Sequence, residues 1–148
     1  MAELDTRPSV SKYETPSAEV REGRKKVVVR LAGTATIKPM VQCVAPREGD
    51  TNLHAHPNTD GFWFVLTGSS RWYGDDDELL AELGPNESIM IPRGTRYWFE
   101  AAGDEPLEIL HIAVTDPGID PRRDRVDHRP PTESLRPSIG VDAAQRQV

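Results

Sequence analysis

The chain has 148 residues, a hydrophobic share of 36% and a formal net charge of −6 at pH 7. A chain of this length accommodates one domain with a single core. The negative charge argues against a nucleic-acid or anionic-membrane surface, because both favour an excess of Lys and Arg. The sequence contains neither the roughly 18-residue apolar stretch of a membrane span nor the apolar core of a signal peptide. We therefore expect a soluble cytoplasmic protein without a nucleic-acid or membrane partner.

The apolar residues are concentrated in the middle of the chain. Residues 1–24 mix Pro, Ser, Glu and Arg without a sustained period, which predicts a flexible N-terminal arm. Residues 25–115 must then supply the core. Residues 116–148 are dominated by Pro, Arg, Asp and Ser, which predicts a disordered tail or one that wraps loosely around the core. A polar arm can pair with a second copy of the chain, so we expect a homodimer.

Strand-forming segments recur along the middle of the chain, with Gly and Pro turns between them. Pro39 places the second segment at a sheet edge or a break, and a polar loop over 46–52 precedes His54. The three aspartates after Gly74 indicate a solvated hairpin tip, because they lack the ligand spacing of a calcium loop. No helical period of useful length is present, so residues 25–115 predict one antiparallel β-barrel or sandwich. The expected strands are 25–31, 35–44, 62–66, 71–73, 88–91, 96–100 and 107–114.

The stretch HAHPNTDGFWFVLTG, residues 54–68, contains the strongest candidate site. His54 and His56 are separated by one residue, so in an extended strand they point to the same side, about 7 Å apart along the chain. One metal ion can bridge that distance. Two imidazoles are a half-site, however, because protein sites for divalent metals usually supply three or more ligands.

These residues resemble the cupins, small β-barrels of jelly-roll type. The first cupin motif has two histidines separated by one residue, then a glutamate and a closing glycine; His54, His56 and Gly68 match it. In the second motif a proline and a glycine precede a histidine, and Pro92 and Gly94 match it. The resemblance spans about residues 49–114 and implies a single jelly-roll barrel.

The departures from the cupin motifs fall on the metal ligands that the resemblance implies. Gly61 occupies the position of the glutamate, and Tyr97 occupies the position of the last histidine. Only two of the four expected ligands remain. Asp60, Tyr97 or His111 could complete a site for a divalent ion such as Fe, Mn, Ni or Zn. In a metal-free interpretation, His54 and His56 are hydrogen-bonding or acid–base groups.

The resemblance also implies which side chains face the barrel interior. If position 61 faces inward, strand alternation turns Trp63 inward with it, and Tyr97 and Phe99 likewise. Such an interior favours a flat or partly apolar small ligand with one or two polar groups, although these aromatic side chains could equally be core filling. The guanidinium groups of Arg71, Arg93 and Arg96 could bind a carboxylate at the mouth.

Two functions follow from these observations. The first is an enzyme that uses a bound metal, or His54 and His56 together with Tyr97, for isomerisation, cyclisation, lyase or oxygen chemistry on a small organic molecule. The second is a non-catalytic cupin that binds a small molecule or serves as a dimerising module. Retention of both histidines favours the enzyme, and loss of two ligands favours the binding module.

Overall fold

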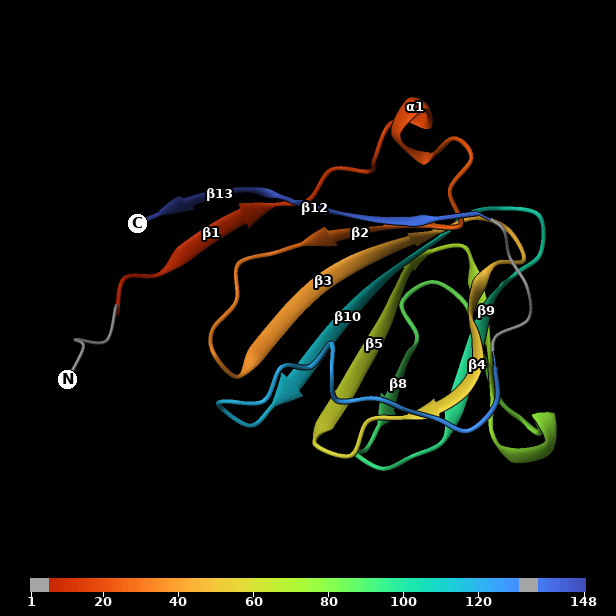
Figure 1. Cartoon of the computed structure of the whole chain (residues 1–148). Helices are drawn as coiled ribbons and strands as arrows, with labels where there is room; N and C mark the ends of the chain where they lie inside the picture. Colours follow the sequence, from red (N-terminus) through yellow and green to blue (C-terminus); the bar gives the residue numbers. More distant parts are fainter. Residues whose placement is uncertain (1–5, 131–135) are drawn as a thin grey trace.

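Two mainly antiparallel β-sheets face each other across the core of the computed structural model, which describes residues 6–130 and 136–148 (Figure 1). In spatial order, the first sheet comprises β12 (Ser138–Asp142), β2 (Lys26–Arg30), β3 (Ile37–Val44), β10 (Leu107–Thr115), β5 (Thr59–Thr67) and β8 (Ser88–Ile91). The second comprises β11 (Val126–Asp127), β4 (Gly49–Ala55), β9 (Tyr97–Ala102), β6 (Ser69–Tyr73) and β7 (Leu79–Leu83).

Two short strands and two short helical segments lie outside these sheets. They are β1 (Ser9–Lys12), β13 (Ala144–Gln147), α1 (Ala18–Arg21) and η1 (Asp75–Asp77). Strands β1 and β13 pair with each other in a separate two-stranded ribbon. Among the described residues, no helix is long and apolar enough to cross a membrane.

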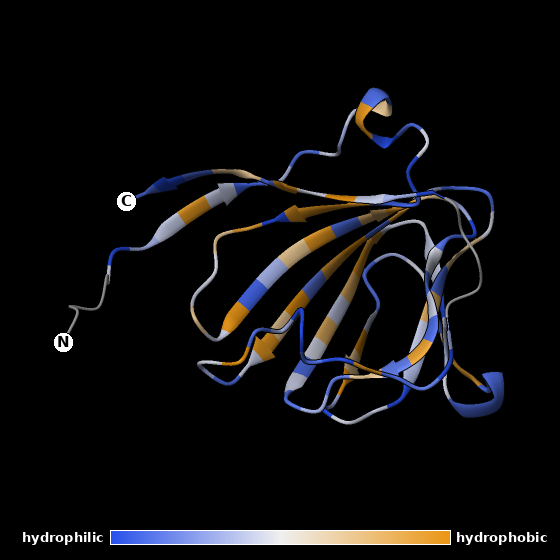
Figure 2. Cartoon of the chain, in the orientation of Figure 1, coloured by the Kyte–Doolittle hydropathy of each residue, from blue (hydrophilic) through white to orange (hydrophobic). Residues whose placement is uncertain are grey.

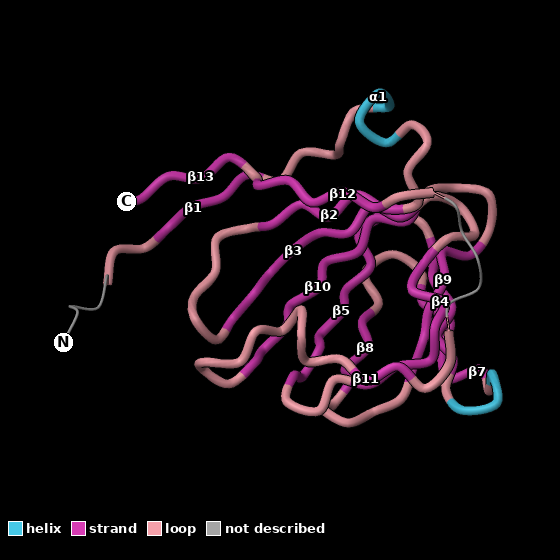
Figure 3. The backbone as a smooth tube through the Cα atoms, in the orientation of Figure 1, coloured by secondary structure: helices cyan, strands magenta, loops and turns pink. Residues whose placement is uncertain are grey.

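The strands from β3 to β10 repeatedly change sheet as the chain advances. Strands β3, β5, β8 and β10 belong to the first sheet, and β4, β6, β7 and β9 belong to the second (Figure 3). The pairings within this set are antiparallel, as in a jelly roll. The prediction of an all-β antiparallel jelly roll is therefore confirmed.

Aromatic side chains fill the space between the sheets. Trp63, Trp72 and Phe99 are almost completely buried, and their ring centroids lie 4.6–5.1 Å apart. The Trp72 indole N–H donates to the Ser70 hydroxyl at 2.9 Å, so its polar group is satisfied within the core. Buried and less buried positions alternate along the strands that carry these rings, as a half-buried sheet requires. Figure 2 shows hydrophobic residues, in orange, on the strands of both sheets.

The structure refines two of the local predictions. The predicted polar loop over 46–52 is wrong in its second half, because β4 already begins at Gly49. His54 and His56 therefore lie at the end of β4, before the turn into β5. Pro39 lies within an interior strand, but pairing between β2 and β3 stops at Arg30 and Met40, so no N–H is needed on that side of Pro39.

Both ends of the chain contain regular structure: β1 and α1 lie before residue 24, and β11, β12 and β13 lie after residue 116. Of the two alternatives for the C-terminal part, this arrangement agrees better with a tail that lies along the barrel than with disorder. In the C-terminal part, β12 pairs in parallel with β2. The prediction of a flexible arm at residues 1–5, and that of a tail at residues 131–135, lie outside the described residues. The sequence signal was weak because these strands are short and their side chains are largely polar or exposed.

The ends cover one half of the outer face of the first sheet. Val27, Val29 and Cys43 form a small buried cluster there. Tyr13 and Val20 pack against it, and Ile139 and Val141 of β12 lie beside it in the same sheet. The N-terminal segment is anchored beside them, because the hydroxyls of Tyr13 and Thr15 both donate to the Glu108 carboxylate of β10.

Replacing Val141 by Asp tests whether β12 is part of the folded barrel. The substitution places a carboxylate against the Val29 side of this cluster and should lower the free energy of unfolding by about 2 kcal/mol. Urea unfolding followed by tryptophan fluorescence measures it. Arg146→Ala, on exposed β13, is the matched control and should change stability by less than about 0.5 kcal/mol. Equal effects of both substitutions would contradict the packing of β12 on this cluster.

Candidate functional site

A cavity of about 140 Å³ opens at one end of the barrel, between the two sheets. His56, Tyr97 and His111 contribute its chemically active side chains, and apolar side chains contribute most of the remaining wall. Its lining consists of Met40, His56, Thr59, Gly61, Ile91, Pro92, Tyr97, His111, Ala113, Pro121 and Arg122.

His54 and His56 lie side by side, as their spacing predicted. Their ring centroids are 5.1 Å apart and the ring planes are nearly perpendicular. The Nδ1 atom of His54 lies 2.7 Å from the Asn52 carbonyl oxygen, and that of His56 lies 2.5 Å from the Asp124 carbonyl oxygen. A carbonyl can only accept a hydrogen bond, so in each neutral ring the proton is on Nδ1 and the lone pair is on Nε2.

Tyr97 completes a cluster of three rings with the histidine pair. Its ring centroid lies 4.5 Å from that of His54 and 6.3 Å from that of His56. Burial, reinforced by the Asp50 carboxylate, raises the Tyr97 pKa well above its ordinary value, so the phenol keeps its proton. Burial lowers the pKa of His54 to about 4, despite the opposing effect of its bond to Asn52. The cluster thus contains a protonated phenol beside a neutral imidazole.

Trp63 and His111 stack against each other below the cavity, with ring centroids 3.6 Å apart and nearly parallel planes. Gly61 permits this arrangement. A Cβ atom at Gly61 would lie 3.1 Å from Trp63 Nε1 and 3.4 Å from His111 Nε2. The space that a side chain at position 61 would enter is therefore bordered by the edges of these two rings.

The segment between β10 and β11 closes one side of the cavity, and no sequence signal pointed to it. Pro121 and Arg122 lie in the cavity wall. Asp124 anchors the segment, because its carboxylate accepts hydrogen bonds from the Asn58 backbone N–H and side-chain amide and from the Thr59 hydroxyl. Burial would raise the Asp124 pKa, but these donors lower it, so the carboxylate stays ionised.

A second polar network lies behind the histidines. Lys26 and Asp50 form a largely buried ion pair at 3.0 Å. Burial opposes ionisation of Asp50, but the Lys26 ammonium outweighs it and holds the Asp50 pKa well below its usual range. The fixed negative charge of Asp50 disfavours a phenolate at Tyr97. No motif signals this pair in the sequence, because its two members lie on different sheets.

Several of the predicted site residues, His54 among them, do not line the cavity. Asp60 points to the outer face and pairs with Arg93, and Arg71 pairs with Glu82 on the exposed surface. Trp63 and Phe99 face inward as predicted, but they belong to the buried aromatic core. His111, whose orientation the sequence could not give, faces the cavity.

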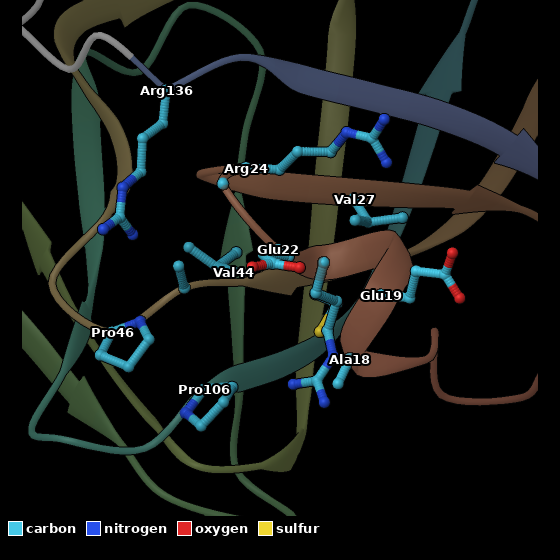
Figure 4. Close-up of a pocket in the computed structure, with 13 residues that line it drawn as sticks. Ala18, Glu19, Glu22, Arg24, Val27, Val44, Pro46, Pro106 and Arg136 are labelled. Carbon is cyan, nitrogen blue, oxygen red and sulfur yellow. The ribbon is translucent and has the colours of Figure 1, made fainter.

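A larger cavity of about 580 Å³ lies outside the barrel, beneath α1 (Figure 4). Its wall mixes the charged side chains of Glu19, Glu22, Arg24 and Arg136 with apolar residues. Its one nucleophile among the described residues, Cys43, is buried, and burial raises the Cys43 pKa, which keeps the thiol protonated and unreactive. The barrel cavity is therefore the better candidate, although it is the smaller of the two.

Residues 40–113 match the model of the cupin domain family, which amounts to half of the chain. The chain belongs to the cupin family. Two curated relatives contain a similar segment. Mannose-1-phosphate guanylyltransferase 2 of Escherichia coli O157:H7 is 35% identical over 74 residues, 49% of this chain and 14% of that protein. Mannose-1-phosphate guanylyltransferase of Escherichia coli strain K12 is 35% identical over 69 residues, 47% of this chain and 14% of that protein. This cupin thus matches only a small part of either relative.

Solved structures show the same fold at low sequence identity. A double-stranded β-helix protein from Klebsiella pneumoniae superposes with a TM-score of 0.61 and 15% identity, over 80% of this cupin and 87% of that chain. Pac13 of Streptomyces, bound to uridine, superposes with a TM-score of 0.56 and 18% identity, over 72% of this cupin and 78% of that chain. At these identities the likeness concerns the fold alone.

The residues present in this cupin do not make up the four-ligand metal site that the resemblance implied. The Nε2 lone pairs of His54 and His56 suit a metal, but the glutamate position is Gly61, and its surroundings are occupied by the rings of Trp63 and His111. Within 6–130 and 136–148, no group of three His, Cys, Asp or Glu side chains is placed to hold an ion.

The depressed histidine pKa values predict a specific loss of stability in acid. Burial lowers the pKa of His54 to about 4 and that of His111 to about 3, from an ordinary 6.5. Between the lowered pKa values and 6.5, the unfolded chain binds more protons than the folded chain. The free energy of unfolding should therefore fall as the pH drops from about 6.5 through about 4. The carboxylates with lowered pKa values add their own loss only at lower pH.

Urea unfolding at a series of pH values measures this dependence. His111→Phe keeps a ring against Trp63 and should reduce the slope between pH 6.5 and 4 by up to about 1.4 kcal/mol per pH unit, one proton's worth. His128→Gln, at an exposed position, should leave the slope unchanged. A slope in His111→Phe equal to that of the wild type would contradict a buried neutral His111.

Proposed function

We propose that this cupin is an enzyme that transfers a proton at carbon on a small organic molecule, as an isomerase or lyase. One observation carries the proposal: His56, with Nδ1 committed to the Asp124 carbonyl, and Tyr97, a protonated phenol, line the same small cavity. A fixed acceptor and a fixed donor on one wall are the minimum requirement for general acid–base catalysis.

The two groups have complementary roles in the proposed reaction. His56 Nε2 accepts a proton from a carbon next to a carbonyl, and the electron pair of the broken C–H bond moves to the carbonyl oxygen. Tyr97 donates a hydrogen bond to the oxyanion that develops there. In a β,γ-unsaturated carbonyl compound, His56 returns the proton to the γ-carbon while the electron pair on the oxyanion restores the carbonyl group, which completes an isomerisation. Departure of a β-substituent, protonated by Tyr97 or His56, completes an elimination.

The size of the cavity restricts the substrate. Pockets for drug-sized ligands generally measure about 300–1,000 Å³, and this one measures about 140 Å³. A short-chain metabolite fits that volume and a large cofactor does not. Met40, Ile91 and Ala113 supply apolar contacts for a carbon chain.

The likeness to Pac13 gives this proposal limited support. Pac13 is described as a nucleoside dehydratase, so a barrel of this type can host an elimination. With 18% identity between the chains, the substrate of Pac13 is not transferred to this protein. We therefore base the proposed class of reaction on the cavity residues, and we do not propose a nucleoside as the substrate.

The proposed reaction needs no metal. His54 then serves as a neutral ring that packs against Tyr97 and His56 and holds them in place, rather than as a ligand. The alternative of a metal enzyme is tested by elemental analysis of protein purified without added metal. Stoichiometric Fe, Mn, Ni or Zn, lost in His56→Ala, would replace the present proposal.

The second candidate function is a cupin that binds a small molecule without reaction. It is favoured by the absence of the glutamate and histidine ligands of the two cupin motifs, at Gly61 and Tyr97. The two candidates share the ligand cavity and differ in turnover. A wild-type protein that binds small carbonyl compounds but leaves every carbon-bound hydrogen unchanged would support binding alone.

Proton abstraction can be measured before the natural substrate is known. In D₂O the wild type should catalyse deuterium incorporation next to the carbonyl in members of a panel of small ketones, 2-oxo acids and hydroxy acids, followed by NMR. His56→Gln removes the base and should reduce the rate at least about 100-fold. Tyr97→Phe removes the donor and should reduce it about 10²–10³-fold.

Tyr73→Phe is the matched control for loss of a phenol. Tyr73 stacks on Trp98 on the opposite side of the second sheet, and its hydroxyl makes a long hydrogen bond to Glu100, at 3.5 Å. The exchange rate of this variant should equal that of the wild type. Full exchange activity in Tyr97→Phe would reduce Tyr97 to a packing role and refute the assigned donor.

We also propose that this cupin forms a homodimer through the uncovered half of the first sheet's outer face. Strand register places Phe62 beside both Ile112 and Met90, and Val114 beside Ile37, on that face. Met90 and Ile37 are 57% and 45% exposed. Apolar side chains gathered on one sheet face in this way mark an interaction surface. The separate ribbon of β1 and β13 continues from β12, the edge strand of this sheet, and projects beyond the barrel, where a second copy can contact it (Figure 1).

Light scattering after size-exclusion chromatography tests the dimer. The wild type should show twice the chain mass at micromolar concentration, and Met90→Lys should shift it to the monomer by placing a charge in the interface. Leu80→Lys is the control, because Leu80 is 46% exposed on β7 of the other sheet. A monomeric wild type would end this proposal.

A further inference from the structure

We infer that the substrate of this site is a short-chain carboxylic acid and that Arg122 recognises its carboxylate. This inference rests on the proposed function, because it concerns the same cavity. It begins from the charge of the cavity wall. Among the described residues, no Asp or Glu lines the cavity, and Arg122 is the one Lys or Arg in its lining. His111, with its pKa lowered by burial to about 3, adds no charge at neutral pH. The cavity therefore favours an anion.

Arg122 has donors available for a ligand. Its contacts with the Asp120 carboxylate are long, 3.3 Å from Nε and 3.5 Å from one terminal nitrogen, compared with about 2.7–2.9 Å for a strong charge-assisted bond. The side chain is 89% exposed, so the pair is screened by water and contributes little. A guanidinium carries five N–H donors in a planar fork, and a carboxylate of a ligand can engage the remaining ones.

The Asp120 carboxylate is partly satisfied without the Arg122 side chain. It accepts a hydrogen bond from the Arg122 backbone N–H at 3.0 Å and pairs with Arg123 at 4.0 Å. Rotation of the Arg122 guanidinium toward a ligand therefore leaves Asp120 with partners. Its pKa is lowered first by that backbone bond, so the geometry of the turn, rather than the side chain, is the main cause of its ionisation.

The other cations near the mouth are committed elsewhere. Arg93 pairs with Asp60 and Asp116 on the outer face. Arg125 donates to Asp127 and to the Asn52 side chain. Neither lines the cavity, so Arg122 alone among these three arginines is placed to meet an anion that enters it.

His111 supplies a second, deeper polar group. Its Nδ1 atom is buried and has no hydrogen-bond partner in the described part of the chain. A buried N–H without a partner is rarer in proteins than a buried acceptor without one. The proton of neutral His111 is therefore on Nε2, the atom that faces Gly61 in the cavity wall. The cavity thus offers donors from Arg122, Tyr97 and His111 and one acceptor from His56.

This set of groups defines the ligand. A carboxylate at the mouth contacts Arg122, and a second oxygen one carbon away contacts Tyr97 or His111. The adjacent carbon then lies toward His56, and the rest of a short chain packs on Met40 and Ile91. Short-chain 2-oxo and 2-hydroxy carboxylic acids have this pattern of oxygens.

Paired ligands that differ only in charge test the inference. Isothermal titration of the wild type with 2-oxobutanoate and with the neutral 2-oxobutanamide should show at least tenfold tighter binding of the acid. In Arg122→Ala the affinity for the acid should fall at least tenfold, while the affinity for the amide stays unchanged. In Arg122→Lys part of the lost affinity for the acid should return. Arg123→Ala removes a neighbouring arginine of equal exposure that does not line the cavity, and it should bind both ligands as the wild type does.

Several outcomes would overturn the inference: no binding of the acid, equal binding of acid and amide by the wild type, or equal losses in Arg122→Ala and Arg123→Ala. Failure of the proposed function is separable, because His56→Gln should still prefer the acid while failing to exchange deuterium. If the wild type prefers the acid but exchanges no deuterium, carboxylate recognition stands and catalysis falls. If it exchanges deuterium without preferring the acid, catalysis stands and carboxylate recognition falls.

Discussion

The hydrogen bonds of Asp124 hold the candidate site together. Its carboxylate ties the segment after β10 to the turn between β4 and β5, and its carbonyl fixes the tautomer of His56. Without these bonds Pro121 and Arg122 would not form a wall of the cavity, and the His56 ring would be free to turn. One residue from the C-terminal part thus determines both the shape of the cavity and the position of the proton on the His56 ring.

The interior of this barrel differs from the cupin pattern in a coordinated way. Loss of a side chain at Gly61 coincides with the close stacking of Trp63 and His111 beside it. Replacement of a ligand by Tyr97 places a phenol next to two imidazoles, and the nearby Asp50 charge helps keep that phenol protonated. These differences leave a hydrogen-bond donor, the Tyr97 phenol, beside two imidazoles whose Nε2 atoms are acceptors. They support acid–base chemistry in an apolar cavity.

The sequence was sufficient to predict the barrel, and its limits have physical causes. Turns such as Pro92-Arg93-Gly94 and the apolar strands between them are local signals, so β8 and β10 were placed within about one residue. The inward direction of His56 and Tyr97 followed from strand alternation. Asp124 and Arg122 could not be found in this way. Asp124 forms hydrogen bonds with residues more than sixty positions earlier, and Arg122 lines the cavity in the segment that these bonds anchor; no local pattern records either.

The same limit applies to the two ends of the chain. Strands β12 and β13 contain too few apolar residues to stand out, and they form because β2 and β1 offer free edges. The sheet completes them through backbone hydrogen bonds, which composition does not reveal. Part of the predicted tail is therefore the edge strand of the first sheet.

The ribbon of β1 and β13 has a consequence for the order in which the molecule folds. It pairs Ser9 with Gln147, so its closure spans almost the whole chain. The loss of chain entropy on closing so long a loop becomes small only after the barrel has brought both ends to the same side. The ribbon should thus form last and open first, and amide hydrogens there should exchange while those of β5 and β10 remain protected. The two ends of this protein therefore pair only after the barrel has folded.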